Sequence, residues 1–190
     1  MDPVIEAAFK HISRRDFLPP DMAVNADQNM PLPIGYGQTN SQPETVQRML
    51  EWLQIEPGDN ILDVGSGSGW TSALLAYLTG KHGRVTAIEI VPELVASGRE
   101  NVAKTGIKNI EFHQAGKTVG WPANAPYDKI LVSAAATEIP ETLLEQLVEN
   151  GRAVIPVGPA IVVIDKDEQG NTIQTPHVGY VFVPLVLPAQ

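Results

Sequence analysis

The chain has no cysteine and little basic charge. Without a single Cys among 190 residues, it can form no disulfide framework and perform no thiol chemistry. It carries 13 Lys and Arg against 22 Asp and Glu, which gives a formal net charge of −9, and its basic residues are scattered singly or in pairs. Because nucleic-acid binding requires a basic patch that neutralises phosphates, we expect no nucleic-acid partner.

Long apolar runs and metal-binding patterns are also missing. No segment approaches about 18 uninterrupted apolar residues, so we expect no membrane span. The beginning of the chain lacks the basic, then apolar, then small-residue pattern of a secretory signal, which favours a cytoplasmic protein. The four histidines are far apart in the sequence, so we expect no metal site. They are His11, His82, His113 and His177.

The composition is that of an ordinary globular protein, with 43% hydrophobic and 18% charged residues. A chain of this length fits one domain. We expect a single domain over 1–190, in which 1–59 supplies helices and a long loop, 60–160 forms an α/β core, and 161–190 adds antiparallel strands.

Strand-like and helix-like segments alternate from Asn60 onward. This order is typical of a doubly wound, mostly parallel α/β sheet. The predicted strands are Ile61–Val64, Val85–Ile88, Ile110–His113, Lys129–Ser133, Ala153–Val157 and Ile161–Ile164. The predicted helices between them are Trp70–Thr79, Pro92–Lys104 and Ile139–Glu149.

The two ends of the chain depart from this alternation. Upstream, Val4–Ile12 and Glu44–Leu53 have helical periodicity and predict an N-terminal helical extension, and the proline-rich stretch Phe17–Pro43 between them is irregular. Downstream, the polar stretch Asp165–Asn171 precedes the apolar segment Val178–Leu185. This pattern predicts a hairpin-like connection and an antiparallel edge on the sheet.

The most informative motif follows the first core strand. The run from Ile61 to Trp70 reads as a buried strand that breaks into glycines at alternate positions and then enters a helix, a form that brings the backbone close to a nucleotide-type ligand. Dinucleotide-binding motifs have the spacing G-x-G-x-x-G, whereas here the spacing is G-x-G-x-G, which disfavours a nicotinamide dehydrogenase. The shorter form resembles the first motif of S-adenosylmethionine (SAM) methyltransferases. The candidate cofactor-binding residues are Asp63, Gly65, Ser66, Gly67, Ser68 and Gly69.

An acidic residue ends the second predicted strand. Glu89 lies 20 residues beyond Gly69, where a carboxylate can accept both hydroxyls of a ribose. The alternative is a solvated charge at the end of a strand. The glycine motif favours ribose binding, and we predict that Glu89 and its neighbour Ile90 contact the cofactor.

The segment Pro31–Pro43 closely resembles the PIGYGQTISQP segment of protein-L-isoaspartate O-methyltransferases, with Asn40 in place of isoleucine. Shorter matches follow the family order along nearly the whole chain. They are Arg15–Pro19, Asp63–Gly69, Pro92–Leu94, Gly120–Trp121, Ala125–Asp128, Ile155–Gly158 and Phe182–Leu185. The resemblance implies SAM as cofactor and, as partners, damaged proteins or peptides with L-isoaspartyl residues, whose repair begins with methylation. It implies a monomer as well.

In that family the serine that matches Ser41 lies beside the cofactor and assists methyl transfer, and Thr39 is the second candidate catalytic residue. A structural role competes with this interpretation. Ser41 and Glu44 have the spacing of a capping box at the start of a helix, and Thr39 could serve as another local cap. Ser133, which ends the fourth predicted strand among small residues, would face the sulfonium and methyl of SAM or simply allow tight packing.

The chain departs from the family pattern at two places. Gly116 and Lys117 stand where the family has the aspartate that contacts adenine, so we expect them to bind the cofactor through backbone groups. Val181 stands where the family has arginine. These departures motivate alternatives: a relative that binds SAM or peptide without activity, or a methyltransferase for a different carboxylate.

Overall fold

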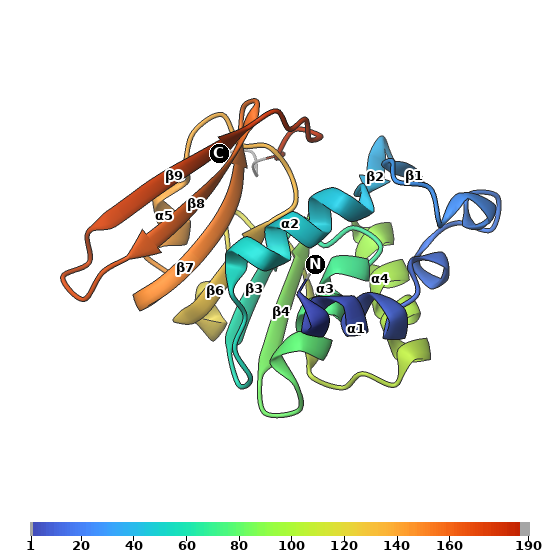
Figure 1. Ribbon diagram of the computed structural model, residues 1–190, viewed down its shortest axis with the longest axis horizontal. Helices are drawn as coiled ribbons and strands as arrows, with labels where there is room; N and C mark the ends of the chain where they lie inside the picture. The colour runs from blue at the N-terminus through green and yellow to red at the C-terminus, as the bar shows by residue number, and fades with distance from the viewer. Residues whose placement is uncertain (1, 187–190) are drawn as a thin grey trace.

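The computed structural model describes residues 2–186. Within that range, seven strands form one sheet in the order β5-β4-β3-β6-β7-β8-β9 (Figure 1). Their bounds are β3 Asn60–Val64, β4 Arg84–Glu89, β5 Ile110–Gln114, β6 Tyr127–Val132, β7 Leu147–Val157, β8 Ala160–Lys166 and β9 Thr172–Val178. β5, β4, β3, β6 and β7 run parallel, and β8 and β9 each run antiparallel to the strand before. The predicted α/β class, its mostly parallel sheet and its antiparallel edge are confirmed.

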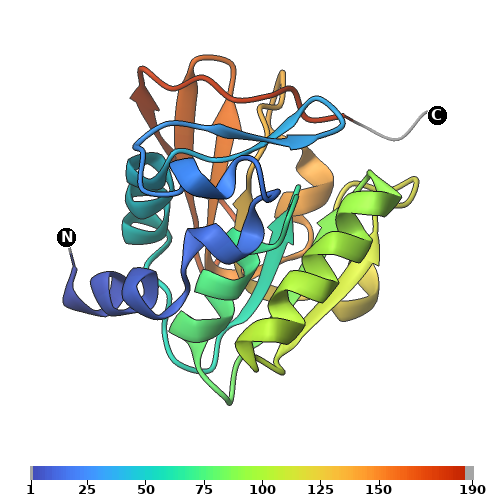
Figure 2. The same ribbon diagram turned by 90° about the vertical axis from the view of Figure 1, so that its right-hand side faces the viewer.

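Helices cover both faces of this sheet. On one face, α1 (Pro3–His11), α2 (Pro43–Leu53), α3 (Trp70–Thr79) and α4 (Pro92–Thr105) bury their apolar side chains in a common cluster with the strands. Figure 2 shows α3 and α4 packed along the strands that they connect. On the other face, a second cluster joins the sheet to the short helix α5 (Glu141–Leu144). None of the helices in residues 2–186 is long and apolar enough to cross a membrane.

The predicted helix Ile139–Glu149 is wrong beyond its first turn. α5 ends at Leu144, and Leu147 already belongs to β7, where it pairs with Tyr127 of β6. The register of that pair shifts before Arg152, and Asn150 in the shifted part has a φ of 60°. Pairing of Leu147 with β6 outweighs the helical spacing of these apolar residues, because tertiary contacts override local propensity.

The last predicted strand, Val178–Leu185, is also wrong. The hairpin itself is confirmed, but its second strand is β9, which ends at Val178. Gly179, at a φ of 102°, turns the chain and donates its N–H to Pro159. The following segment then crosses the end of the sheet, where Ala135 donates to Val183 and Leu185 donates to Ala135, both at 2.8 Å.

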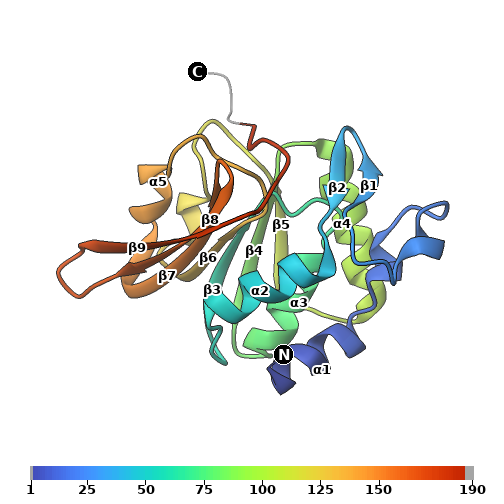
Figure 3. The ribbon, with the colours of Figure 1, turned by 45° about the horizontal axis from the view of Figure 1, so that its top comes forward.

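The stretch Phe17–Pro43, expected to be irregular, contains a small hairpin. β1 (Leu32–Gly35) pairs with β2 (Gln38–Asn40) through a turn in which Tyr36 and Gly37 have positive φ. Figure 3 shows this hairpin and the final segment of the chain at the same end of the sheet. That end holds the carboxyl termini of the parallel strands. In α/β proteins ligands bind at this end, at the point where the strand order reverses, which here lies between β3 and β6.

Candidate active site

The glycine turn after β3 is fastened to the end of β4. The N–H groups of Gly65 and Ser66 donate to the carbonyl oxygen of Ile88 at 2.9 and 3.1 Å. The Glu89 carboxylate accepts from the N–H of Gly67 at 2.9 Å and from the N–H of Val91 at 3.0 Å. Glu89 is therefore no solvated charge at a strand end: its side chain is only 6% exposed and shapes the turn.

Gly69 shows why the third glycine comes where it does. It has a φ of 90° and stands at the N-cap of α3. A Cβ there would lie 3.1 Å from the carbonyl oxygen of Gly98 and 3.2 Å from the ring of Phe112. Glycine at this position therefore allows the close contact between the start of α3 and α4, and this contact supports the turn.

A cleft opens between the glycine turn, the β1–β2 hairpin and the final segment of the chain. It encloses about 690 Å³ when the open space at its mouth is included. Six of the predicted site residues line it: Thr39, Gly65, Gly67, Glu89, Ile90 and Ser133. Most other lining residues are apolar, so the cleft combines apolar walls with one carboxylate and a few hydroxyls.

A smaller cavity on the other side of the turn is rich in hydroxyl groups. Thr39, Ser41, Ser66, Ser68, Thr71 and Ser133 belong to its lining. The hydroxyl oxygen of Ser66 is buried and has no hydrogen-bond partner among the described residues. An unpartnered buried hydroxyl is costly unless a ligand satisfies it, so this cavity fits a ligand with polar ends, such as the amino-acid portion of SAM.

Asp63 lies beneath the turn rather than in the cleft. It is fully buried and accepts a hydrogen bond from the Ser72 hydroxyl at 2.6 Å, and its other carboxyl oxygen has no partner among residues 2–186. Burial raises the pKa of this carboxyl to about 7, and the negative charge of Glu89 acts in the same direction. The Ser72 hydrogen bond opposes both effects.

A third cavity leads outward from the hydroxyl groups. It is lined by Pro31, Thr39, Ser41, Gln42, Thr45, Ser133, Val181, Phe182 and Val183. Thr39 and Ser133 also line the cleft beside the β1–β2 hairpin, and Ser41 also lines the hydroxyl-rich cavity. The three spaces thus meet at one corner formed by Thr39, Ser41 and Ser133.

The predicted capping box at Ser41 and Glu44 is wrong. Gln42 is the N-cap residue of α2 and makes no side-chain cap, and Thr39 belongs to β2. The N–H of Glu44 instead donates to the side-chain oxygen of Asn29 at 3.0 Å, and the amide of Asn29 donates back to the Glu44 carboxylate at 2.9 Å. A side chain 15 residues away caps the helix, so the Ser41 hydroxyl is left for the site.

Four predicted cofactor residues line none of these cavities: Asp63 and Gly69, described above, and Gly116 and Lys117. Gly116 and Lys117 are exposed, while their neighbours Ala115, Thr118, Val119 and Gly120 line the cleft. This loop is held by Gln146, which was not predicted. Its side chain accepts from the N–H of Trp121 at 2.8 Å and donates to the carbonyl oxygen of Val119 at 3.0 Å. The pattern around Gln146 resembled a helix, which hid that role.

Other lining residues were not predicted as site residues either. They are Ile34, Gln38, Val64, Ile88, Ala134, Val183, Pro184, Leu185 and Val186. The motif at Phe182–Leu185 pointed to part of this set. Within the described part of the chain, no three His, Cys, Asp or Glu side chains are grouped to hold a metal ion.

Comparison with known proteins identifies the family. The model of the family described as Protein-L-isoaspartate(D-aspartate) O-methyltransferase matches residues 1–190. The protein-L-isoaspartate O-methyltransferase of Methanococcoides burtonii is 43% identical over 182 residues, which cover 94% of this chain and 90% of that one. The enzyme of the same name from Aeropyrum pernix is 43% identical over 184 residues, covering 94% of this chain and 71% of its own.

Solved structures agree with this result. A protein-L-isoaspartate O-methyltransferase superposes with a TM-score of 0.87 at 26% identity, over 96% of this chain and 61% of that chain. The Plasmodium falciparum beta-aspartate methyltransferase, in complex with S-adenosyl-L-homocysteine, has a TM-score of 0.85 at 25% identity, over 97% of this chain and 91% of its own. None of these findings supports an inactive relative or a dehydrogenase. The chain belongs to the protein-L-isoaspartate(D-aspartate) O-methyltransferase family, whose members are SAM-dependent enzymes.

Proposed function

We propose that the corner formed by Thr39, Ser41 and Ser133 is where a methyl group passes from SAM to the free carboxylate of an L-isoaspartyl residue. The observation that carries this proposal is the meeting of three cavities at these hydroxyl groups. The cleft beside the β1–β2 hairpin reaches the corner from one side, and the outward cavity reaches it from the other. A donor and an acceptor that enter by separate routes can therefore meet there.

The residues present fit SAM. Glu89 borders the cleft and would accept hydrogen bonds from the ribose hydroxyls, while Ile88, Val119 and Leu185 supply apolar walls for the adenine. Ser66, whose buried hydroxyl lacks a partner among the described residues, would meet the amino-acid portion. The bound cofactor supplies a methyl group on a positively charged sulfur.

The chemistry requires no base. A carboxylic acid with a pKa of about 4 is already ionised at pH 7, so the acceptor oxygen needs no deprotonation. The hydroxyls of Ser41 and Thr39 would donate hydrogen bonds to the carboxylate and fix the direction of its free oxygen. Alignment of this kind can lower a barrier by about 7–11 kcal/mol. The apolar walls exclude water, which favours the approach of opposite charges.

We place the peptide around the isoaspartyl residue in the outward cavity and the groove that continues it. This groove lies between α2 and the 178–181 segment and is lined by Arg48, Trp52 and Tyr180 among others. Pro31, Gln42, Thr45 and Val181 line both spaces, so a peptide chain can run from one into the other. The methyl ester leaves by the same route and then closes spontaneously to a succinimide with release of methanol, the step of repair that follows methylation.

We further propose that the enzyme acts as a monomer in the cytoplasm on proteins and peptides rather than on nucleic acids. The net charge of −9 supports the absence of a nucleic-acid substrate. Sedimentation analysis of the purified protein tests the first point: a dimer at micromolar concentration contradicts it.

A pair of peptides tests the proposed reaction. The purified protein is incubated with methyl-labelled SAM and a peptide that contains L-isoaspartate, beside the same peptide with ordinary aspartate. We expect label on the isoaspartyl peptide only. Equal label on both peptides would indicate a general carboxyl methyltransferase, and label on neither would overturn the proposal.

A further inference from the structure

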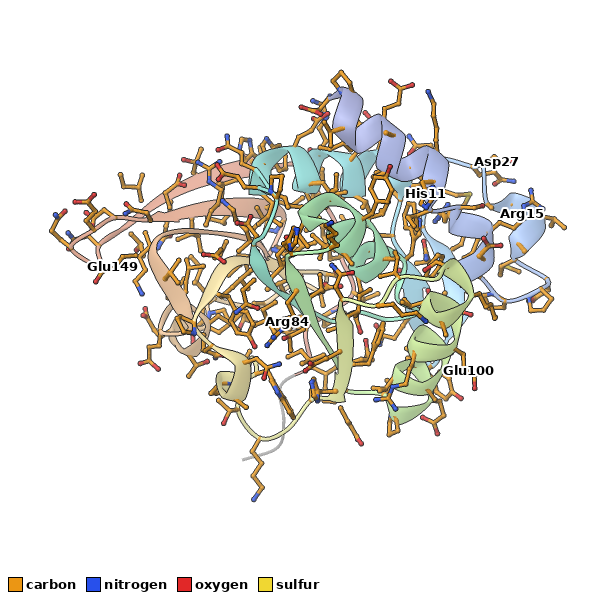
Figure 4. The ribbon with its side chains drawn as sticks, turned by 90° about the horizontal axis from the view of Figure 1, so that it is seen from below. His11, Arg15, Asp27, Arg84, Glu100 and Glu149 are labelled. Atoms are coloured by element: carbon orange, nitrogen blue, oxygen red, sulfur yellow. The ribbon has the colours of Figure 1, made fainter. Side chains whose placement is uncertain are left out.

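Arg14 is a buried cation without an anionic partner. Its side chain is 6% exposed, and no carboxylate of the described residues forms an ion pair with it. Its neighbour Arg15 lies at the surface, 3.7 Å from the Asp27 carboxylate (Figure 4). Two adjacent arginines therefore have opposite environments, and the burial of Arg14 requires an explanation.

The guanidinium of Arg14 is surrounded by oxygen atoms of the segment that carries the predicted catalytic serine. It donates to the backbone carbonyls of Asn40 and Ser41 at 3.0 and 2.9 Å. Its Nε donates to the side-chain oxygen of Asn40 at 2.8 Å. The remaining acceptors are the carbonyls of Ala26, Gln28 and Met30, at 3.3, 3.0 and 2.8 Å.

Asn40 extends these contacts to the cofactor turn. It is 5% exposed, and its amide nitrogen donates to the Ser68 hydroxyl at 3.3 Å. Ser68 belongs to the glycine turn, and its carbonyl accepts from Asn101 of α4 at 3.2 Å. The Asn40 side chain therefore joins Arg14, the end of β2 and the glycine turn that borders the cleft.

The ring of Trp70 completes the enclosure. The guanidinium carbon of Arg14 lies 5.4 Å from the centre of the indole, within the range of a cation–π contact. The indole nitrogen donates to the carbonyl of Ile12 at 3.3 Å. Trp70 opens α3, so the N-terminal segment is tied to the glycine turn through Asn40 and to the start of α3 through Trp70.

We propose that Asn40, held in place by Arg14, is a positioning residue that couples cofactor binding to peptide binding. When the cofactor contacts the glycine turn, the hydrogen bond between Ser68 and Asn40 links that contact to the adjacent Ser41. The carboxylate-binding corner is then preformed for the peptide. The proposal rests on the function proposed above, since Ser41 must face the peptide carboxylate for the coupling to matter.

The coupling is measured as the ratio of the peptide dissociation constants without and with S-adenosyl-L-homocysteine, determined by calorimetry with an isoaspartyl peptide. No methyl group can be transferred in this complex. For the native protein we expect S-adenosyl-L-homocysteine to tighten peptide binding by at least about fivefold, the usual lower bound of coupling between two sites. Arg14 is unsuited to substitution because its replacement threatens folding, so the variants are made at Asn40 and Ser68.

Three variants separate positioning from stability. Asn40→Leu keeps the volume and removes the link to both partners; Ser68→Ala removes the far acceptor. Asn40→Asp keeps an acceptor for Arg14, and its carboxylate can accept a hydrogen bond from the Ser68 hydroxyl, so it retains both links. We expect the coupling ratio to fall below about twofold in Asn40→Leu and Ser68→Ala but not in Asn40→Asp, and the melting temperature to fall in Asn40→Leu but recover in Asn40→Asp. The double variant Asn40→Leu/Ser68→Ala should lose no more coupling than Asn40→Leu alone.

The outcomes distinguish this proposal from the one on which it rests. A native protein that methylates the peptide but shows no coupling overturns the role of Asn40 alone. The role of Asn40 is also overturned if folded Asn40→Leu has the coupling ratio of the native protein. It is overturned as well if the double variant loses more coupling than Asn40→Leu alone. A native protein that does not methylate the isoaspartyl peptide overturns the proposed function.

Discussion

The carboxylate of Glu89, at the end of β4, accepts a hydrogen bond from the N–H of Gly67 at 2.9 Å, in the turn that follows β3. One acidic side chain thus sets the shape of the turn and borders the cleft. Its other oxygen accepts from Val91 at the start of α4. The turn after β3, the end of β4 and the start of α4 therefore meet at this residue.

Replacement of Glu89 by glutamine should weaken SAM binding by at least about tenfold, because hydrogen bonds to a carboxylate are stronger than those to a neutral amide. The amide would also place a donor toward the N–H of Gly67 or Val91. Calorimetric titration with SAM measures the effect. Glu93→Gln, an exposed residue in the first turn of α4, removes the same charge and should bind SAM normally. Equal affinity in the two variants would contradict the role of Glu89.

Gly69→Ala should destabilise the fold by about 1–3 kcal/mol, because alanine at a φ of 90° is strained and its Cβ would press on Gly98 and Phe112. Gly116→Ala is the matched control, since nothing lies within 4 Å of a Cβ at that exposed position. Urea denaturation compares the two. A Gly69→Ala protein as stable as the control would show that the turn tolerates a side chain.

The buried carboxyl of Asp63 should make stability depend on pH. Its pKa is raised from 3.8 to about 7 by burial, so the folded state retains a proton that the unfolded state loses. The stability that this retained proton gives the folded state is fully present below the pKa of the unfolded state and is lost as the pH rises from about 4 to about 7. Asp63→Asn keeps an acceptor for Ser72 without titrating. Its melting temperature relative to the native protein should therefore rise between pH 5 and pH 8; a constant difference would contradict the shift.

Arg48 should select peptides by charge. It is exposed on α2 and lines the groove proposed for the peptide. Arg48→Glu should lower kcat/KM several-fold for isoaspartyl peptides with acidic flanking residues, and the effect should shrink at high ionic strength. Arg84→Glu makes the same charge change at the beginning of β4, away from the carboxyl ends of the strands (Figure 4). The two variants should differ, and identical peptide preferences would place the peptide elsewhere.

Local patterns predicted the elements that depend on local structure. Trp70–Thr79 was predicted with the bounds that the structure gives, because an apolar stripe is followed by Gly80 as C-cap. The strands predicted at Ile61–Val64, Lys129–Ser133, Ala153–Val157 and Ile161–Ile164 were found from their near-continuous apolar runs. Gly65, Gly67, Glu89 and Ser133 line one cleft because a doubly wound sheet brings strand ends together, and their contact with the cofactor stays a prediction.

Long-range contacts decided what the sequence could not reveal. The cap of α2 comes from Asn29 rather than Ser41, and β7 begins at Leu147 because Tyr127 of β6 pairs with that residue. The wall formed by Val183–Val186 arises from a turn at Gly179. Arg14 appeared as one basic residue among others, since its acceptors lie 12 to 27 positions away along the chain.

The central claim is that the Ser41 hydroxyl holds the acceptor carboxylate and does not hold the cofactor. It is tested most directly by measuring, for Ser41→Ala, both kcat on an isoaspartyl peptide and the dissociation constant of SAM. Loss of a hydrogen bond to a carboxylate should lower kcat by about tenfold or more and leave SAM affinity unchanged. Unchanged turnover, or a loss of SAM affinity as large as the loss of turnover, would contradict the account.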